Sequence, residues 1–354
     1  MKFTIVVFLS CFSILLIGQT SNKADQLLLD LVEEKKMVGV IAAYAIDGEV
    51  KWQNSAGYAC RDEKIPFTDS TLTRIASIAK PMTAIAIMQL VEQGLIDLEQ
   101  PIQTYLPEFP TKEKGTITTR HLLAHISGIP QYYDEKEIEN KRFFPSLADA
   151  MTVFENRPLL FEPGSKFFYT TYGYVTLGRI IETVSGLSYE EYMQKNIFDK
   201  AGMKNTGVEK KAESYANKSC LYHKKRRRAK EGKQNDLSNR IPGGGFYSTL
   251  SDLISFGNAL LEGKLIADTS FQQMIVNQFK EKEGNPYGLG WFLYGTPPNE
   301  NVVIGHSGEQ TGAATQIMLI PKSKTIVVVL SNTSRTWKEV VTYSTQLIQI
   351  SEEK

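Results

Sequence analysis

Strand patterns lie at both ends of the chain, and helical patterns fill its middle. Near the N-terminus, residues 38–46 and 50–58 predict two strands joined by a tight turn at Asp47–Gly48. Near the C-terminus, we predict three strands and a final helix: 302–305, 315–320, 325–330 and 337–350. This order favours one antiparallel sheet built from both termini and flanked by helices, an α/β (α+β) fold with an inserted helical subdomain.

One segment before the first strand group and several segments between the two groups have helical spacing of apolar residues. This spacing predicts helices over 25–36, 78–91, 104–125, 175–184, 189–198 and 250–261. We place one catalytic domain at 21–354 and its helical subdomain at 76–240. A binding site is expected where the sheet and the helical subdomain meet.

Composition excludes several classes of protein. The 354 residues are 42% hydrophobic and 22% charged, which is typical of a globular chain with a large core. A net charge of +1 gives no electrostatic reason to bind nucleic acid, so we expect no nucleic-acid partner. The exception is the basic segment 218–233, which contains Lys224–Arg228. It predicts a solvated loop, and weak contact with an anionic surface is the alternative.

The first residues resemble an export signal. An apolar run over 3–17 follows Met1–Lys2 and is shorter than the roughly 20 residues that span a bilayer. We interpret residues 1–20 as a signal peptide of a secreted or periplasmic protein, with an N-terminal membrane anchor as the alternative. Outside this run, Cys60 and Cys220 fit one disulfide or two buried free thiols equally well.

Ser77 and Lys80 open a helix that is apolar on nearly every face. Pro81 is tolerated only in a first helical turn, so this helix begins near Ser77. Lys80 lies three residues further on, on the same face, and burial disfavours its charged form. A serine beside a neutral buried amine is a candidate nucleophile. The alternative is a helix cap followed by a surface lysine.

Two other patterns carry less chemistry. Residues 305–309 are close to the nucleophile elbow of α/β-hydrolases, but Glu309 replaces the final glycine and no histidine follows. His121 and His125 have the spacing of two metal ligands on one helix. Leu122 stands where a zinc protease carries glutamate, and no third ligand is evident, so we expect no metal ion.

Three motifs together resemble those of a known family. In chain order they are Ser77-x-x-Lys80, Tyr169-Thr170-Thr171 and His306-Ser307-Gly308. They resemble the active-site motifs of the serine β-lactamase and penicillin-binding protein superfamily, in particular the class C type with its esterase and D-aminopeptidase relatives. Segments 120–130, 243–249 and 287–291 also resemble that branch. The resemblance covers nearly the whole chain after the leader and implies a β-lactamase/transpeptidase-like fold without a cofactor.

The resemblance implies acyl transfer. Ser77 would attack a carbonyl carbon, Lys80 would accept its proton, and Tyr169 would pass a proton to the leaving group. The backbone amides of Ser77 and Glu309 would hold the oxyanion. The resemblance further implies substrate binding by five residues: Thr171, His306, Ser307, Gly308 and Glu309.

Two positions depart from the usual motifs. Thr171 stands where asparagine is usual, and His306 stands where lysine is frequent, a combination that resembles the mitochondrial β-lactamase-like peptidases. Loss of the lysine charge and asparagine amide removes groups that would hold a penicillin. We therefore expect a hydrolase of peptides, D-amino-acid peptides or esters. A β-lactamase, a D,D-carboxypeptidase and a non-catalytic binding module are the alternatives.

His306 also leads to a pH expectation. A histidine with an ordinary pKa of about 6.5 gains charge as the pH falls through that value. If His306 behaves in this way, carboxylate ligands should bind more tightly under acidic conditions.

Overall fold

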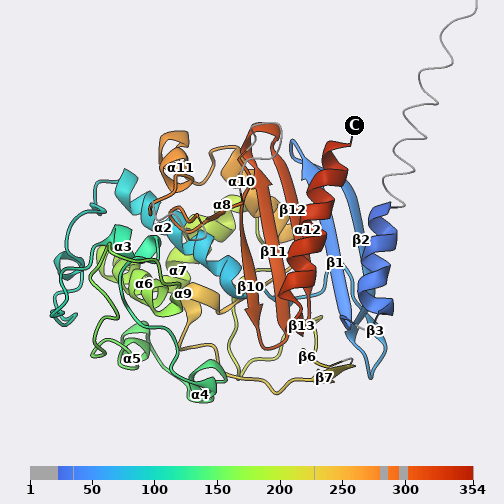
Figure 1. Ribbon diagram of the computed structural model, residues 1–354, viewed down its shortest axis with the longest axis horizontal. Coiled ribbons are helices and arrows are strands. Elements are labelled where there is room, and N and C mark those ends of the chain that lie inside the picture. The colour runs from blue at the N-terminus through green and yellow to red at the C-terminus, as the bar shows by residue number, and fades with distance from the viewer. Residues whose placement is uncertain (1–22, 35, 227, 280–285, 295–301, 354) are drawn as a thin grey trace, which may run out of the picture.

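A seven-stranded sheet forms the centre of the computed structural model, which describes residues 23–34, 36–226, 228–279, 286–294 and 302–353 (Figure 1). The strand order is β3–β2–β1–β12–β11–β10–β9, and every neighbouring pair is antiparallel. The strands are β1 (Gly39–Ile46), β2 (Glu49–Cys60), β3 (Ile65–Pro66), β9 (Phe292–Leu293), β10 (Ile304–Gln310), β11 (Ala313–Ile320) and β12 (Thr325–Ser331). Because β1 pairs with β12, the two termini share one sheet, and the predicted fold class is confirmed.

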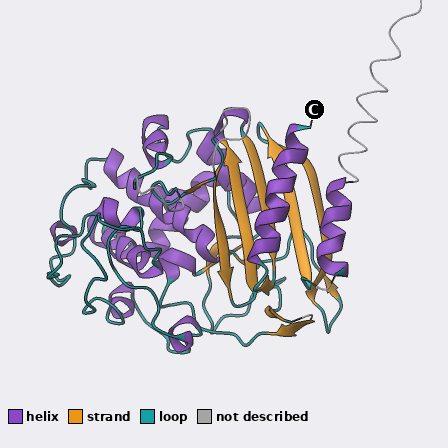
Figure 2. Ribbon diagram, viewed as in Figure 1, coloured by secondary structure: helices purple, strands orange, loops and turns teal. Residues whose placement is uncertain are grey.

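Both faces of this sheet are buried, which explains the continuous apolar runs of its strands. Ile41 and Val328 belong to the larger core, with the helices of the middle of the chain. Val40 and Val327 point to the opposite face, beneath the N-terminal helix 23–33 and α12 (Trp337–Glu352). Figure 2 shows these helices on one side of the sheet and the larger helical group on the other.

The larger helical group comes from the middle of the chain, and so do the remaining short elements except the last helical turn and the last short strand. The helices are α2 (Ala79–Glu92), α3 (Thr119–Leu123), α4 (Glu135–Ile138), α5 (Leu147–Met151), α6 (Thr171–Ser185), α7 (Tyr189–Met193), α8 (Asp199–Ala201), α9 (Ile241–Gly244), α10 (Leu250–Leu261) and α11 (Asp268–Met274). The shorter helical turns are η1 (Ala76–Ile78), η2 (Ile102–Thr104), η3 (Gln194–Phe198) and η4 (Pro321–Ser323). The other strands are β4 (Thr73–Arg74), β5 (Gly207–Val208), β6 (Tyr222–Lys225), β7 (Arg228–Glu231), β8 (Phe246–Ser248) and β13 (Thr333–Ser334).

The long helix predicted over 104–125 is wrong for most of its length. Only η2 at its start and α3 near its end are helical. Pro107, Pro110 and Gly115 lie between them, and a proline inside a helix removes a backbone donor and clashes with the preceding turn. Three helix-breaking residues therefore outweigh the apolar spacing.

The basic segment 218–233 is a β-hairpin rather than the predicted irregular loop. Strands β6 and β7 pair with each other, and β6 also pairs with β13 beside the main sheet. Lys224 donates to Glu339 of α12 at 2.6 Å. A strand needs backbone pairing but few apolar side chains at a sheet edge, so the composition of this segment did not reveal it.

Cys60 and Cys220 form a disulfide, which resolves the two alternatives left open by the sequence. The bond joins the end of β2 to the residues before β6 across a sequence separation of 160. Among the residues that the structure describes, the one close group of three metal-type ligands is Cys60, Glu63 and Cys220, and both of its thiols are used by this bond.

The predicted leader, residues 1–20, lies outside the described residues. Within the described ranges, no helix combines the length and the apolar character needed to cross a bilayer.

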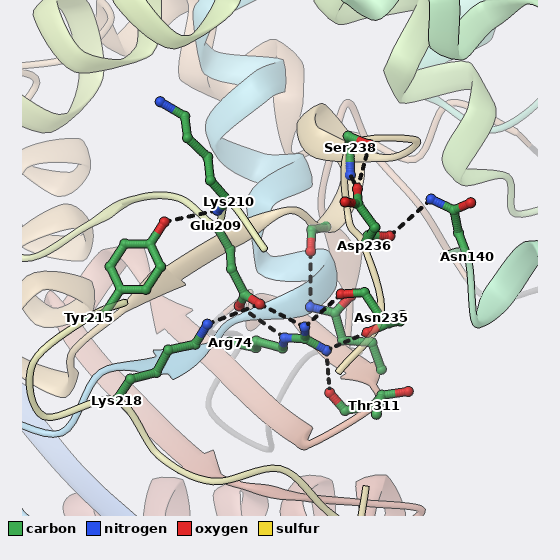
Figure 3. Close-up of polar contacts among 12 residues, drawn as sticks. Arg74, Asn140, Glu209, Lys210, Tyr215, Lys218, Asn235, Asp236, Ser238 and Thr311 are labelled. Atoms are coloured by element: carbon green, nitrogen blue, oxygen red, sulfur yellow. Dashed lines mark hydrogen bonds and ion pairs between the residues drawn. The ribbon is translucent and has the colours of Figure 1, made fainter. Parts of the chain in front are cut away.

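A buried ion pair joins Arg74, on the strand before Ser77, to Glu209, which directly follows β5 (Figure 3). Arg74 donates from Nε and Nη2 to the two carboxylate oxygens of Glu209 at 2.9 and 2.6 Å. Its Nη1 donates to Asn235 Oδ1 at 2.7 Å and to the Thr311 carbonyl at 2.9 Å. Burial would raise the pKa of Glu209, but Arg74 and the nearby Lys218 outweigh it and lower that pKa. Four separate segments therefore depend on one guanidinium.

Removal of the disulfide should lower stability. The double variant Cys60→Ala/Cys220→Ala should lose about 3 to 5 kcal/mol of unfolding free energy, because the bond closes a long loop in the unfolded chain. Urea unfolding with and without reductant measures this loss. Reductant should destabilise the wild type and leave the double variant unchanged, and equal stability of the two oxidised proteins would contradict the prediction.

Removal of the Arg74 charge should also destabilise the fold. Arg74→Met leaves the Glu209 carboxylate buried without its main partner, which should remove about 3 to 5 kcal/mol. The matched control is Lys23→Met, since the Lys23–Glu353 pair is exposed and should contribute less than about 1 kcal/mol. Denaturant midpoints of the two variants measure these losses of unfolding free energy. A similar small loss in both variants would show that the buried pair does not anchor the fold.

Candidate active site

Ser77 lies on a tight turn between β4 and α2. Hydrogen bonds from other segments hold this turn in a strained backbone conformation. Ala76, immediately before it, has a φ of +48°, a conformation that non-glycine residues rarely adopt. The neighbouring Ile75 is held at both backbone groups. Its amide donates to the Phe246 carbonyl at 3.0 Å, and its carbonyl accepts from Thr315 Oγ1 at 3.0 Å. Ser77 is therefore presented from a position that its surroundings determine.

Strand β10 passes this turn at very short range, and Gly308 makes that approach possible. A Cβ at this position would lie 2.5 Å from the Ile75 carbonyl oxygen and 3.0 Å from Ala76 Cβ. Any side chain would therefore push β10 away from the turn. Gly308 is buried and serves the site by allowing close backbone contact.

Lys80 is completely buried on the first turn of α2, beside Ser77. Its Nζ lies 3.0 Å from Ser77 Oγ, 2.7 Å from the Gly243 carbonyl and 3.3 Å from Thr171 Oγ1. Burial lowers the pKa of Lys80 well below its ordinary value, and the charge of Arg240 lowers it further. The surroundings therefore favour the neutral amine.

The aromatic ring of Tyr169 covers the other side of this amine. Lys80 Nζ lies 4.9 Å from the ring centroid. Burial raises the pKa of the Tyr169 phenol well above its ordinary value, although its hydrogen bond with Ser77 acts in the opposite direction. The phenol therefore keeps its proton near neutral pH. The structure brings together all three residues predicted as catalytic.

His306 does not meet the expectation based on its ordinary pKa. The side chain is fully buried, and its Nδ1 donates to the Ser307 carbonyl at 2.7 Å. Its Nε2 therefore accepts from the Tyr287 hydroxyl at 3.1 Å. Burial lowers the pKa of His306 to about 3, with the Lys80 charge acting in the same direction. The ring stays neutral in ordinary buffers, so the expected gain of charge under mild acid is wrong.

The two histidines considered as metal ligands are also placed differently from the prediction. Helix α3 ends before His125, which has a φ of +60°, so the pair does not share one helical face. His125 is buried, and its Nδ1 accepts from the Thr170 amide at 3.2 Å. Its ring centroid lies 4.3 Å from that of Tyr169. His125 therefore packs behind the site, a role that the i, i+4 spacing did not indicate.

A cavity of about 210 Å³ opens beside Ser77. Tyr169, Thr171 and Glu309 contribute to its walls, so two of the five predicted substrate-binding residues line it. His306, Ser307 and Gly308 are not among its lining residues and form the strand behind it.

The cavity also has walls that the sequence interpretation missed. Gln131 receives the Thr171 amide hydrogen bond at 2.9 Å and donates to Thr171 Oγ1 at 3.1 Å. Tyr132 and Arg240 line the same space. Arg240 precedes the glycine-rich segment 243–249, which is the one signal that pointed toward it. Gln131 and Tyr132 follow the segment 120–130 in the same way.

The groups around this cavity suit acyl transfer. They comprise a hydroxyl on a fixed turn, a buried amine and a protonated phenol. The serine hydroxyl of this set can form an ester with an acyl group. The amine and the phenol can move protons between the serine oxygen and the leaving group.

Comparisons with known proteins agree with this chemistry. The beta-lactamase family model matches residues 24–348. The human serine beta-lactamase-like protein LACTB, mitochondrial, is 28% identical in an alignment that covers 85% of this chain and 72% of the relative. Penicillin-binding protein 4* of Bacillus subtilis (strain 168) is 29% identical over 343 residues, covering 89% and 72% respectively.

A solved structure supports the same assignment. The penicillin binding protein from Bacillus halodurans superposes with a TM-score of 0.78 and 27% identity, over 92% of this chain and 98% of that chain. The resemblance inferred from the three motifs is thus confirmed by sequence and fold. The chain belongs to the beta-lactamase family, within the superfamily of serine β-lactamases and penicillin-binding proteins.

Proposed function

We propose that this protein is an exported serine hydrolase that forms an acyl-enzyme at Ser77 and acts on a peptide, a D-amino-acid peptide or an ester. One observation carries the proposal. The Lys80 amine is fully buried and lies 3.0 Å from Ser77 Oγ, with hydrogen-bond acceptors at its other two contacts.

The three polar contacts of Lys80 match the two hydrogens and the lone pair of a neutral amine. Such an amine has two hydrogens and one lone pair. The Gly243 carbonyl can only accept, and Thr171 Oγ1 accepts the second hydrogen. The lone pair then faces the Ser77 hydroxyl, which can donate its proton as Oγ attacks. Lys80 is therefore the general base in this proposal.

The reaction begins when Ser77 Oγ forms a bond to the carbonyl carbon and its proton passes to Lys80. The carbonyl oxygen becomes an oxyanion, and the backbone amides of Ser77 and Glu309 stabilise it. The close approach of β10 to the serine turn supports this pairing of amides. Collapse of the intermediate breaks the bond to the leaving group, which receives a proton through Tyr169.

Water then completes the cycle. A water molecule gives a proton to the base and attacks the acyl carbon, and Ser77 recovers its hydrogen as the ester bond breaks. Tyr169 keeps its proton near neutral pH, which supports a role as donor rather than as a standing base. His306 and His125 hold the Tyr169 side of the site from behind in this proposal.

The remaining assignments are proposals of the same kind. Thr171 and His306, in place of asparagine and lysine, support a peptidase or esterase over a β-lactamase or D,D-carboxypeptidase. The complete set of Ser77, Lys80 and Tyr169 supports an enzyme over a binding module. Export rests on the apolar run over 3–17, and an anionic surface contact rests on the charges of the hairpin β6–β7.

Substitution of the nucleophile tests the mechanism. Ser77→Ala should abolish Ser77-dependent ester and amide turnover while changing the unfolding free energy by no more than about 1 kcal/mol, because a small half-buried hydroxyl is lost. The readouts are turnover and intact-protein mass after incubation with a fluorophosphonate. The exposed Ser70→Ala variant is the control and should label like the wild type. Undiminished turnover by Ser77→Ala would refute the proposal.

The proton carriers give a second prediction. Lys80→Arg should slow acylation by roughly a hundredfold or more, since arginine stays charged and offers no lone pair. In the wild type, kcat/KM should fall as the pH drops through the lowered pKa of Lys80, because the protonated amine cannot accept the serine proton. Burst kinetics and a pH profile measure these effects. Tyr169→Phe should instead allow a slowly hydrolysing adduct, and unhindered labelling of Lys80→Arg would show that the roles are misassigned.

A further inference from the structure

Arg240 occupies an unusual position for a charged residue. It lies directly before α9 and lines the same cavity as Ser77, Tyr169 and Thr171. Its relative exposure is 3%, so the side chain is almost entirely removed from bulk solvent. A guanidinium stays protonated at all working pH values. The cavity therefore has a permanent positive charge in its wall.

The contacts of Arg240 are all with neutral groups. Its Nε donates to Asn239 Oδ1 at 2.8 Å, and its Nη2 donates to the carbonyls of Glu137 and Ile138 at 2.7 and 2.5 Å. Its guanidinium carbon lies 4.6 Å from the ring centroid of Tyr132. These contacts orient the guanidinium without neutralising it.

No carboxylate of the described residues forms an ion pair with Arg240. The backbone carbonyl of Glu137 accepts from Arg240, but its carboxylate pairs with Arg157. Nη1 of Arg240 donates to no described group, and it is not among the buried side-chain atoms that lack a partner. With no acceptor among the described residues, this nitrogen is not an enclosed atom, and the cavity is the space that Arg240 lines.

The contrast with Arg74 shows what is missing. Arg74 is equally buried, but Glu209 receives two of its hydrogen bonds and compensates its charge. A buried charge without a counter-ion is unfavourable. The amine of Lys80 also lies close enough for the Arg240 charge to act on it, and this amine is not an anion that could compensate that charge. Within the part of the chain that the structure describes, Arg240 lacks the anion that Arg74 has.

We propose that the substrate supplies this anion: the protein acts preferentially on esters or amides that carry a carboxylate, which binds Arg240 through Nη1. This inference rests on the proposed function and names its substrate class. The charge that lysine would bring at position 306 comes instead from Arg240 in the cavity wall.

The cavity is charged asymmetrically, which gives the carboxylate one preferred direction. Glu309 lines the wall formed by β10, and its carboxylate accepts from the Arg335 amide. A substrate carboxylate would be repelled from the Glu309 carboxylate and attracted to the Arg240 guanidinium. The carboxylate can belong to the acyl part or to the leaving group, and matched substrates distinguish the two.

The test uses two pairs of esters that differ only in charge. In the first pair the acyl part is varied: the mono-4-nitrophenyl ester of adipic acid and the 4-nitrophenyl ester of adipamic acid. In the second pair the leaving group is varied: 3-acetoxybenzoate and 3-acetoxybenzamide. The full-length wild type should prefer the charged member of one pair by about ten- to a hundredfold in kcat/KM, the range for one charge-assisted hydrogen bond.

Arg240→Gln should bring that ratio close to one, and Arg240→Lys should retain part of it because the charge is kept. The ratio is an internal control, since a merely structural loss of the contacts to residues 137 and 138 would slow both esters of a pair alike. Arg335→Gln is the matched control, an exposed arginine on the far side of Glu309, and should keep the preference.

The outcomes separate this inference from the proposed function. If no ester shows Ser77-dependent turnover, the proposed function itself fails. If turnover depends on Ser77 but both pairs give ratios near one, or if Arg335→Gln removes the preference and Arg240→Gln does not, the role of Arg240 is refuted.

Discussion

The buried pair of Arg74 and Glu209 is the interaction on which the site geometry depends. Arg74 ends the strand that leads into the serine turn, and its guanidinium also holds the Thr311 carbonyl just beyond β10. The two elements that would supply oxyanion amides, the serine turn and β10, are thus attached to one rigid group. Because the pair is buried and bidentate, its geometry is specified far more closely than that of a surface ion pair.

A carboxylate partner distinguishes the structural cation of this protein from the two cationic side chains of the active site. Arg74 meets a carboxylate and serves as an anchor. Lys80 meets only a carbonyl and two hydroxyls, so burial drives it toward the neutral state in which it can act as a base. Arg240 keeps its charge because a guanidinium does not deprotonate, and it lines the cavity without a carboxylate partner among the described residues. The same physical cost of burial therefore gives three different roles.

Much of the fold could be predicted because its signals are local. The turn at Asp47–Gly48 and the apolar strand runs come from neighbouring residues, and the structure reproduces them in β1, β2 and β12. Predictions failed where backbone pairing or helix breaking outweighed composition. The hairpin β6–β7 is held by β13 and by Glu339, the partner of Lys224, and both are distant from it in sequence. The pairing of Cys60 with Cys220 is equally non-local.

The sequence by itself determined the fold class, the family and the grouping of Ser77, Lys80 and Tyr169, because short motifs and periodicities encode them. Only the tertiary structure decided which charges face the cavity. His306 lies in a motif, yet it is buried and neutral behind the site, whereas Arg240 lies in the wall and was not singled out. Burial and the identity of hydrogen-bond partners depend on segments far apart in the chain, so residue type and spacing cannot reveal whether a side chain is charged or accessible.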